Sequence, residues 1–517
     1  MPSAAWRPLL AALGALVALA GCTVGPNFVR PSAPVPARWP GAVLRPAAST
    51  SPSAPPAHSA LAAPGESIPE LSAVSDTAVS LARWWDQFHD PQLGSLIGRA
   101  LQANLNLRVA MLRTQEALAQ RDISALARWP TLSANASYQL EDISESTPEG
   151  SLLTSVPKFS IPGVGHISIP NPYDQFQLGA TASWELDLFG RLRRNIEAAS
   201  AQAQVSLEDQ RAVRVALLAQ VAQNYLALRG AQARRTVALQ NVATIQDLLL
   251  LTQQRHAAGL NTELDVRNAL AQLSQTRATL PALDLAIDRS LHELGNLLGV
   301  DPEALRGELQ GARALPPVPP SIPIGLPADL VRRRPDIREA EASLHAATAQ
   351  IGVAIANLFP SLTLSGSGGF QSDSLGDLLH WSSLFGGVGP QLDVPVLDRG
   401  AWHTVTLYRL RAREAALTYR STVLTALQQV EDAVAAYQAD QRQRQWLTDT
   451  VAQNQLALAI ARDRYRSGVT DFLNVLDALR TLQANQLALL SAETAVSTDL
   501  VGVYQALGGG WQIPGSA

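Results

Sequence analysis

The only cysteine of the chain, Cys22, stands in a pattern that specifies covalent attachment of lipid. Arg7 gives the N-terminus a positive charge, and a short apolar stretch, residues 9–20, follows it. The tetrapeptide Leu19-Ala20-Gly21-Cys22 matches the cleavage site of bacterial lipoproteins, in which the cysteine becomes the lipidated first residue. We therefore predict that residues 1–21 are a removed signal peptide and that Cys22 carries the lipid. The alternative is an ordinary secretory signal followed by a chance cysteine.

No pattern for catalysis is found in the rest of the chain. The single lysine, Lys158, is not part of a phosphate-binding Gly-x-x-x-x-Gly-Lys loop, and His-Glu-x-x-His, Cys-pair and Gly-x-Ser-x-Gly motifs are missing. The eight histidines are scattered, and the 40 basic residues nearly balance the 44 acidic ones. We therefore predict a protein that is not an enzyme, with no metal, no nucleic-acid partner and no cofactor besides the lipid on Cys22.

The second half of the chain repeats the first. A shift of 209 positions superposes residues 255–299 on 464–508 without a gap, placing Gly259 on Gly468. A second shift, of 230, superposes the segments before the strands, 110–132 and 340–362. A match of this length is internal duplication. A repeated structural unit argues for a scaffold or conduit rather than an active site.

Each copy reads as a helix, a strand pair and a long helical hairpin. Apolar residues alternate with polar or small ones in the strand pairs at about 131–186 and 361–396. The pattern of the first hairpin, 190–299, is helical from Arg191 to about His256, a length of about 100 Å, and a single return helix is predicted from about Thr262 to Leu298. The predicted organisation is a signal peptide (1–21), a Pro/Ala/Ser-rich lipidated tether (22–83), a first repeat (84–310), a Pro-rich linker (311–330), a second repeat (331–510, with its hairpin at 400–508) and a tail (511–517).

The strand pairs have the length and alternation of transmembrane β-strands. Four strands are too few to close a barrel, and open strand edges are not tolerated in lipid. If the strands span a membrane, several chains must therefore share one barrel. The alternative is a small sheet in water on a helical body.

Six segments of the sequence, in this order, resemble the outer membrane factors of tripartite efflux pumps, TolC-like lipoproteins of the NodT type. They are Gly21 to Pro26, Trp84 to Leu93, Leu188 to Arg193, Arg333 to Glu341, Leu358 to Leu362 and Arg464 to Val469. The resemblance covers nearly the whole mature chain. It implies a mainly α fold with a membrane β-barrel: a homotrimer whose twelve-stranded barrel in the outer membrane continues as a long α-helical coiled-coil barrel, with an equatorial region at the linker.

The resemblance also implies which residues form a periplasmic gate. The hairpin turns at Gly259 and Gly468 are expected to contact adaptors, although any helical hairpin needs such glycines. Asp477 corresponds to an aspartate of the closing ring and Leu473 to an apolar ring residue, while Asn474 replaces a second aspartate. Tyr465 corresponds to a tyrosine that ties hairpins together, and Asp265 is the related carboxylate of the first copy. The simpler interpretations are a solvated charge for Asp477 and helix packing for Tyr465.

The function implied is a passive exit duct for drugs or other toxic small molecules. The expected partners are a periplasmic adaptor, an inner-membrane transporter of the resistance-nodulation-division class and outer-membrane lipid. One alternative is a duct that secretes a protein or metabolite. Another is a periplasmic structural lipoprotein without a pore.

Overall fold

The computed structural model describes residues 23–32, 35–36, 39, 73–75, 81–144, 146–147, 171–319 and 321–512. Cys22, Lys158 and the predicted signal peptide lie outside the described residues. The chain divides into two compact units. Unit 1 comprises Met1–Val29, Ala117–Ala203 and Ser343–Ala415, and unit 2 comprises Arg30–Glu116, Gln204–Ala342 and Ala416–Ala517.

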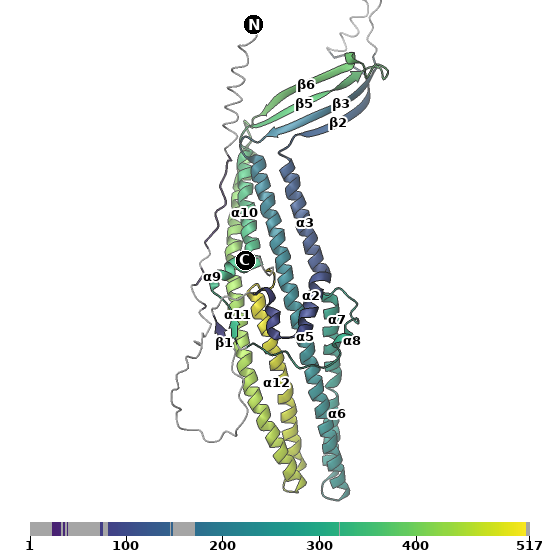
Figure 1. Cartoon of the computed structure of the whole chain (residues 1–517), viewed down its shortest axis with the longest axis vertical. Helices are drawn as coiled ribbons and strands as arrows, with labels where there is room; N and C mark the ends of the chain where they lie inside the picture. Colours follow the sequence, from purple (N-terminus) through teal and green to yellow (C-terminus); the bar gives the residue numbers. More distant parts are fainter. Residues whose placement is uncertain are drawn as a thin grey trace, which may run out of the picture. The chain divides into compact units, whose positions relative to one another are not determined.

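Unit 1 contains one antiparallel sheet of four strands in the order β2-β3-β5-β6 (Figure 1). The strands are β2 (Thr131–Glu141), β3 (Tyr173–Leu186), β5 (Ser361–Ser372) and β6 (Leu384–Asp393), and a short 3-10 helix, η2 (Trp381–Ser383), precedes the last. Alternation of apolar residues predicts a last strand from Val388 to Val396, at the end of the second strand pair, whereas β6 begins and ends earlier. Glycines at 386 and 387 interrupt the alternation there, so the pattern alone hid the start of the strand.

The strand register gives the sheet one apolar face and one polar face. Leu132 lies opposite Ala182, Leu178 opposite Phe370, and Gly366 opposite Val388, so even-numbered positions share one face. That face carries Leu132, Ala134, Ala136, Tyr138, Leu140, Phe176, Leu178, Ala180, Ala182, Trp184, Leu186, Leu362, Leu364, Phe370, Leu384, Val388 and Leu392. Apart from Tyr173 and Phe385, the other face carries Ser, Thr, Gln, Asn and Gly, with acids at strand ends.

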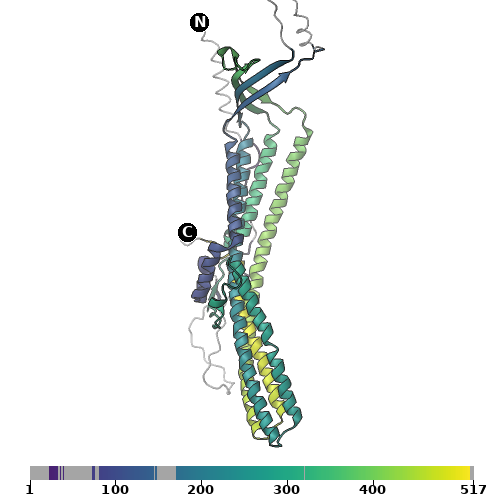
Figure 2. The ribbon, with the colours of Figure 1, turned by 90° about the vertical axis from the view of Figure 1, so that its right-hand side faces the viewer.

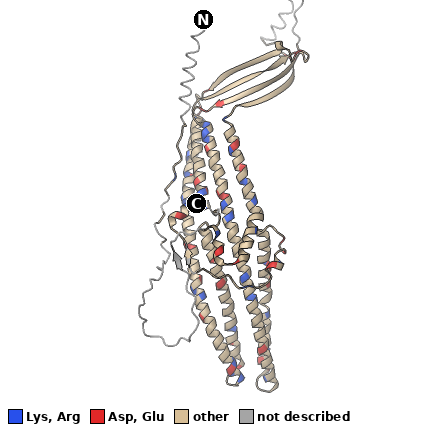
Figure 3. Cartoon of the chain, viewed as in Figure 1, with Lys and Arg blue, Asp and Glu red and all other residues tan. Residues whose placement is uncertain are grey.

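Within the four-stranded sheet, charged residues lie only near the ends of the strands. Figure 3 shows the sheet almost entirely without charge, while charged residues are spread along the helices. The strands contain four acidic residues. Glu141 and Asp393 are the last residues of β2 and β6, and Asp174 and Glu185 are the second and the last but one of β3. The sheet therefore has an uncharged band across its middle.

Two very long helices dominate the rest of the described chain. They are α5 (Arg191–Ala257, 67 residues) and α11 (Arg399–Arg466, 68 residues). Each strand pair is preceded by a helix of 22 residues, α3 (Leu105–Leu126) or α10 (Pro335–Ala356). Within the described parts of the chain, no helix is long and apolar enough to cross a bilayer.

The element boundaries repeat with the offset of the sequence duplication. The helices α5 and α11 end at Ala257 and Arg466, and the return helices begin at Glu263 and Phe472, in both cases 209 positions apart. The second return helix, α12 (Phe472–Ala506), is continuous. The first is not: the expectation of one helix from Thr262 to Leu298 is wrong.

The first return helix is divided into α6 (Glu263–Arg277) and α7 (Leu280–Leu297). Pro281 lies in the first turn of α7. Proline has no backbone N–H to donate, and its ring clashes with the carbonyl four residues earlier, so it is tolerated at a helix start but not within one. The corresponding position of the second copy is Leu490, which allows α12 to continue.

Unit 2 is held together by an aromatic core. Trp84, in the 3-10 helix η1 (Leu81–Phe88), stacks on Tyr504 with ring centres 5.3 Å apart. Asp90 caps α2 (Pro91–Ala103) and accepts a hydrogen bond of 2.6 Å from the Tyr225 hydroxyl. Burial, followed by this hydrogen bond, raises the pKa of Tyr225 to about 12. The Trp84 to Leu93 motif is therefore structural: it joins the first helix to both hairpins.

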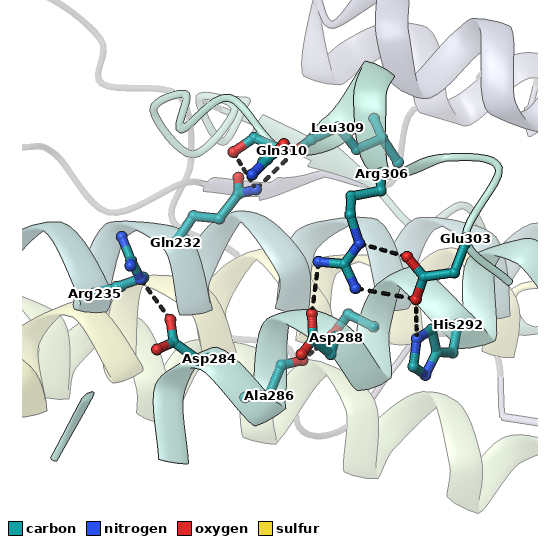
Figure 4. Close-up of polar contacts among 11 residues, drawn as sticks. Gln232, Arg235, Asp284, Ala286, Asp288, His292, Glu303, Arg306, Leu309 and Gln310 are labelled. Atoms are coloured by element: carbon teal, nitrogen blue, oxygen red, sulfur yellow. Dashed lines mark hydrogen bonds and ion pairs between the residues drawn. The ribbon is translucent and has the colours of Figure 1, made fainter. Parts of the chain in front are cut away.

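The segment between the two repeats is tied to the helices by polar contacts (Figure 4). Gln232 of α5 donates a hydrogen bond of 2.7 Å to the Leu309 carbonyl, and Arg306 bridges Glu303 and Asp288. Here lie α8 (Arg306–Leu309), α9 (Pro327–Arg333) and the strand β4 (Ser321–Pro323), which pairs in parallel with β1 (Ala73–Ser75). Residues 73–75 belong to the segment predicted to be an extended or flexible tether, and they form a short strand.

A pair of carboxylates lies between α11 and α12. Burial, followed by the hydrogen bond with Asp440, raises the pKa of Asp499 from 3.8 to about 6. The folded chain therefore binds more protons than the unfolded chain between these pH values. The stabilisation from this proton is fully present below pH 3.8 and is lost as the pH rises to about 6.

We expect Asp499→Asn to stabilise the protein at pH 7.5, by about 1 kcal/mol after solvent screening is allowed for. The advantage should shrink towards pH 4, where the natural carboxyl is protonated as well. Thermal unfolding at the two pH values measures this. Asp284→Asn, which removes an exposed partner of Arg235, serves as the control. A variant that is no more stable at pH 7.5 than the natural chain would contradict the prediction.

Candidate functional site: the helical hairpin turns

The two hairpin turns have the same backbone geometry. Gly259 and Gly468 both have φ of 72°, in the left-handed region that favours glycine. After each glycine, the next amide donates back to a carbonyl five residues earlier, Leu260 to Arg255 and Val469 to Arg464, each over 2.9 Å. This is the Schellman arrangement that ends a helix. A side chain at either position would be strained whatever space surrounds it.

An apolar cluster fixes the start of α12. Phe472, Val475, Leu476 and Leu479 are buried against residues of α5, α6 and α11. The predicted gate residues lie on the other side of the helix: Leu473, Asn474 and Asp477 are all exposed. Because residues four apart share a helix face, Leu473 and Asp477 form one exposed surface. Asn474 adjoins it and donates a hydrogen bond of 2.7 Å to the Thr470 hydroxyl.

Tyr465 connects the two hairpins within the chain. Its ring is only 2% exposed and packs on Phe472, with ring centres 5.8 Å apart. The Arg255 guanidinium lies over the ring at 4.7 Å, and Asn261 donates a hydrogen bond of 3.1 Å to the hydroxyl. Arg255 and Asn261 are on the first hairpin. The tyrosine is therefore both a packing residue and a tie.

Asp265 has a local role that was not predicted, although Thr262-x-x-Asp265 is the sequence pattern of a capping box. Its carboxylate accepts hydrogen bonds of 3.1 Å from the backbone and the hydroxyl of Thr262, which closes a capping box at the start of α6. The Asp265 carboxylate therefore stabilises the N-terminus of α6. Asp477 corresponds to Asn268 of the first copy. It lies within α12 and takes no part in the cap of that helix.

A polar bridge between α6 and α12 was not predicted. Arg480 and Gln483 of α12 meet the buried Gln272 of α6: Arg480 Nε donates to Gln272 Oε1 over 2.6 Å, and Gln272 Nε2 donates to Gln483 Oε1 over 3.2 Å. The two hairpins lie side by side here (Figure 2). The partners are more than 200 positions apart in the chain, and no local pattern marks such a contact.

The residues directly after Cys22 pack at the junction of sheet and helices in unit 1. The Val24 amide donates to the Phe189 carbonyl over 3.1 Å, and Arg194 of α5 donates to the carbonyls of Val24 and Gly25. Thr23 lies so close to Gly190 that any side chain there would come within 2.7 Å of it. Thr23, the residue after Cys22 in the sequence, therefore lies in a fixed segment near the end of β3.

The chain is similar to known outer-membrane proteins along nearly its whole length. The model of the outer membrane efflux protein family matches residues 96–300 and 326–509. Outer membrane protein OprJ of Pseudomonas aeruginosa is 32% identical over 97% of this chain and 96% of its own length. Nodulation protein T of Rhizobium leguminosarum bv. trifolii is 30% identical over 92% of this chain and 91% of its own. The solved outer-membrane channel OprN is 33% identical, with a TM-score of 0.79 over 95% of this chain and all of its own.

These matches confirm the resemblance and the predicted fold class, a mainly helical chain with a four-stranded antiparallel sheet of the TolC-like channel type. The family model covers both repeats, and the whole-chain relatives are channel and transport proteins rather than enzymes. The chain belongs to the outer membrane efflux protein family.

Proposed function

We propose that three copies of this chain close one twelve-stranded barrel. This trimer is the outer-membrane channel through which a tripartite efflux pump releases its substrates. The observation that carries the proposal is the two-faced sheet. Its apolar face suits lipid and its polar face suits a water-filled lumen. The edge strands β2 and β6 each have one neighbour in the described sheet, and open edges are not tolerated in lipid. Three sheets joined edge to edge would give every edge strand a neighbour and would turn the apolar face to lipid and the polar face to the lumen.

The proposed lipid anchor agrees with the position of the N-terminal segment. Thr23 packs beside Gly190, four residues after the end of β3. If β3 spans the outer membrane, Cys22 lies at its periplasmic surface, where acyl chains on the cysteine reach the lipid. Several acyl chains hold a protein firmly, whereas one holds it marginally. Metabolic labelling with a palmitate analogue tests this, and Cys22→Ala should abolish the label.

The proposed gate is the exposed surface of α12 at the hairpin turns. In a trimer, Asp477 occurs three times around one axis, and three carboxylates that approach one another repel and attract cations. Leu473 supplies an apolar ring one turn nearer the tip. Adaptor binding at the turns of Gly259 and Gly468 would separate the hairpins and open the ring. We propose that the channel binds a periplasmic adaptor and works with a resistance-nodulation-division transporter.

We expect Asp477→Ala to increase the single-channel conductance or the open probability in planar bilayers, about twofold or more, because the cation-binding ring is lost. Asp471→Ala, which removes the carboxylate at the N-cap position of α12, is the control. If the Asp477 variant gates as the natural channel does, Asp477 has no part in the closure.

Drug accumulation in cells tests the duct itself. Deletion of the gene should increase the retention of a fluorescent pump substrate, and plasmid-borne natural chain should restore its export. A chain with Leu178→Arg, which places a charge on the apolar face of the sheet, should fail to restore it. Unchanged retention after deletion, with the partner transporter active, would contradict export through this chain.

A further inference from the structure

One aromatic ring extends across the polar face of the four-stranded sheet. It belongs to Phe385 of β6, which pairs with Gly369 of β5, and Gly369 pairs in turn with Gly179 of β3. The tip of the ring, Phe385 Cζ, is 3.4 Å from the place that a Cβ would take at Gly179. Because β5 lies between β6 and β3, the ring extends along this row of residues and crosses β5.

The two glycines leave the row without side chains under the ring. A Cβ at Gly369 would come within 2.4 Å of the Gly179 Cα and 2.2 Å of the Leu178 carbonyl oxygen, so no side chain fits there. The ring therefore rests with one face on bare backbone and leaves its other face open. Phe385 is accordingly only partly buried. It is an aromatic surface on a face that is otherwise almost entirely polar.

The rows on either side of the ring carry uncharged hydrogen-bonding groups. Gln177 pairs with Gln371 in one row, and Thr181 pairs with Ser367 in the other. The side-chain amides of Gln177 and Gln371 hydrogen-bond to no residue that the structure describes. These amides can therefore donate to, and accept from, a molecule that lies on the ring.

We propose that the open face of Phe385 is a stacking site for planar aromatic solutes, with the amides of Gln177 and Gln371 as hydrogen-bond partners beside it. The inference rests on the proposed function, in which the polar face lines the lumen and each substrate passes the ring. Aromatic rings attract one another in offset stacks, and the face of a ring also attracts cations. A planar aromatic cation gains from both contacts and is therefore held longest on its way out.

Block of the channel by ethidium, a planar aromatic cation, measures the stacking. In planar bilayers, ethidium should interrupt the current of the natural channel about fivefold longer than that of Phe385→Leu, which keeps the glycines covered but has no aromatic ring. Phe385→Tyr should behave as the natural chain. Tetraethylammonium, which has the same charge and no ring, should interrupt all three channels equally. Equal ethidium residence in the natural and Phe385→Leu channels would overturn the proposal.

Tyr173→Leu is the matched control, because Tyr173 is the other aromatic residue of the polar face. It is the first residue of β3, and its hydroxyl donates a hydrogen bond of 2.5 Å to Glu141 Oε2. Its loss should leave the ethidium residence unchanged. A shortening as large as that of Phe385→Leu would show that the effect does not belong to the ring over the glycines.

Photolabelling of the natural channel tests the position without any variant. An azide derivative of ethidium, activated by light in outer-membrane vesicles, should label Phe385 or the residues of the two rows beside it, as mapped by peptide mass spectrometry. Excess ethidium should remove this label. Label confined to other parts of the chain, or no label that ethidium displaces, counts against the site.

The current of the natural channel before ethidium is added separates this inference from the proposed function. If the natural chain does not conduct, the proposed function fails. If it conducts but ethidium residence does not depend on Phe385, only the stacking site fails.

Discussion

Leu178→Arg is expected to prevent assembly of the channel in the outer membrane. Leu178 lies near the middle of β3, on the apolar face, opposite Ala136 and Phe370. An arginine at the membrane midplane of a β-barrel costs about 2–4 kcal/mol, and the change occurs in every subunit of the trimer. Outer-membrane fractions should contain little or no folded protein, as measured by heat-modifiable migration on gels, and cells should lose the export of pump substrates.

The neighbouring residue supplies the matched control. Gln177 lies on the polar face of the same strand, opposite Ser137 and Gln371. Gln177→Arg adds the same charge at the same depth, but towards the proposed water-filled lumen, where it should allow assembly and change mainly the ion selectivity. If both variants assemble equally well, the apolar face does not meet lipid and the sheet is a soluble one.

Arg229→Met is expected to destabilise unit 2 by about 3 kcal/mol or more, because several buried or partly buried acceptors lose their donor. Arg229 of α5 is 1% exposed. Its guanidinium donates to the side-chain oxygens of Gln232 and Gln92 and, over 2.7 Å, to the carbonyl of Gly311. It therefore joins three segments: α5, the start of α2 and the chain that leads to the linker between the repeats. Thermal unfolding in detergent measures the loss.

Arg235→Met, six residues further along α5, is the control for this change. Arg235 pairs with Asp284, and both side chains are at least 44% exposed. Exposed pairs of this kind contribute at most about 1 kcal/mol, so the control should unfold close to the natural temperature. Equal losses in the two variants would show that burial of Arg229 contributes nothing.

The features that were predictable from sequence are those with a local period or a repeat. Alternation located β2 and β3 to within three residues, and the length of α5 followed from its helical pattern. Pro281 was visible in the sequence, but the continuous match with the second copy concealed the break that it causes. The three-residue strands β1 and β4 have no period to detect, so their pairing was not predictable.

The candidate site was predictable only in part, for a related reason. The exposure of Leu473 and Asp477 follows from their spacing on a helix that buries its other side. The partners of Tyr465 do not follow in this way, since Arg255 and Asn261 come from a hairpin some 200 positions away. Asp265 was assigned by analogy between the copies, and its helix cap depends on Thr262, which the second copy replaces with Asp471.

The number of chains in one conducting particle tests the central claim most directly. The protein should be extracted from outer membranes in mild detergent, its mass measured by native mass spectrometry and the same sample recorded in planar bilayers. Three sheets that share one barrel predict a particle of three chains that conducts ions. A stable particle of one chain, or a three-chain particle that never conducts, would contradict the account.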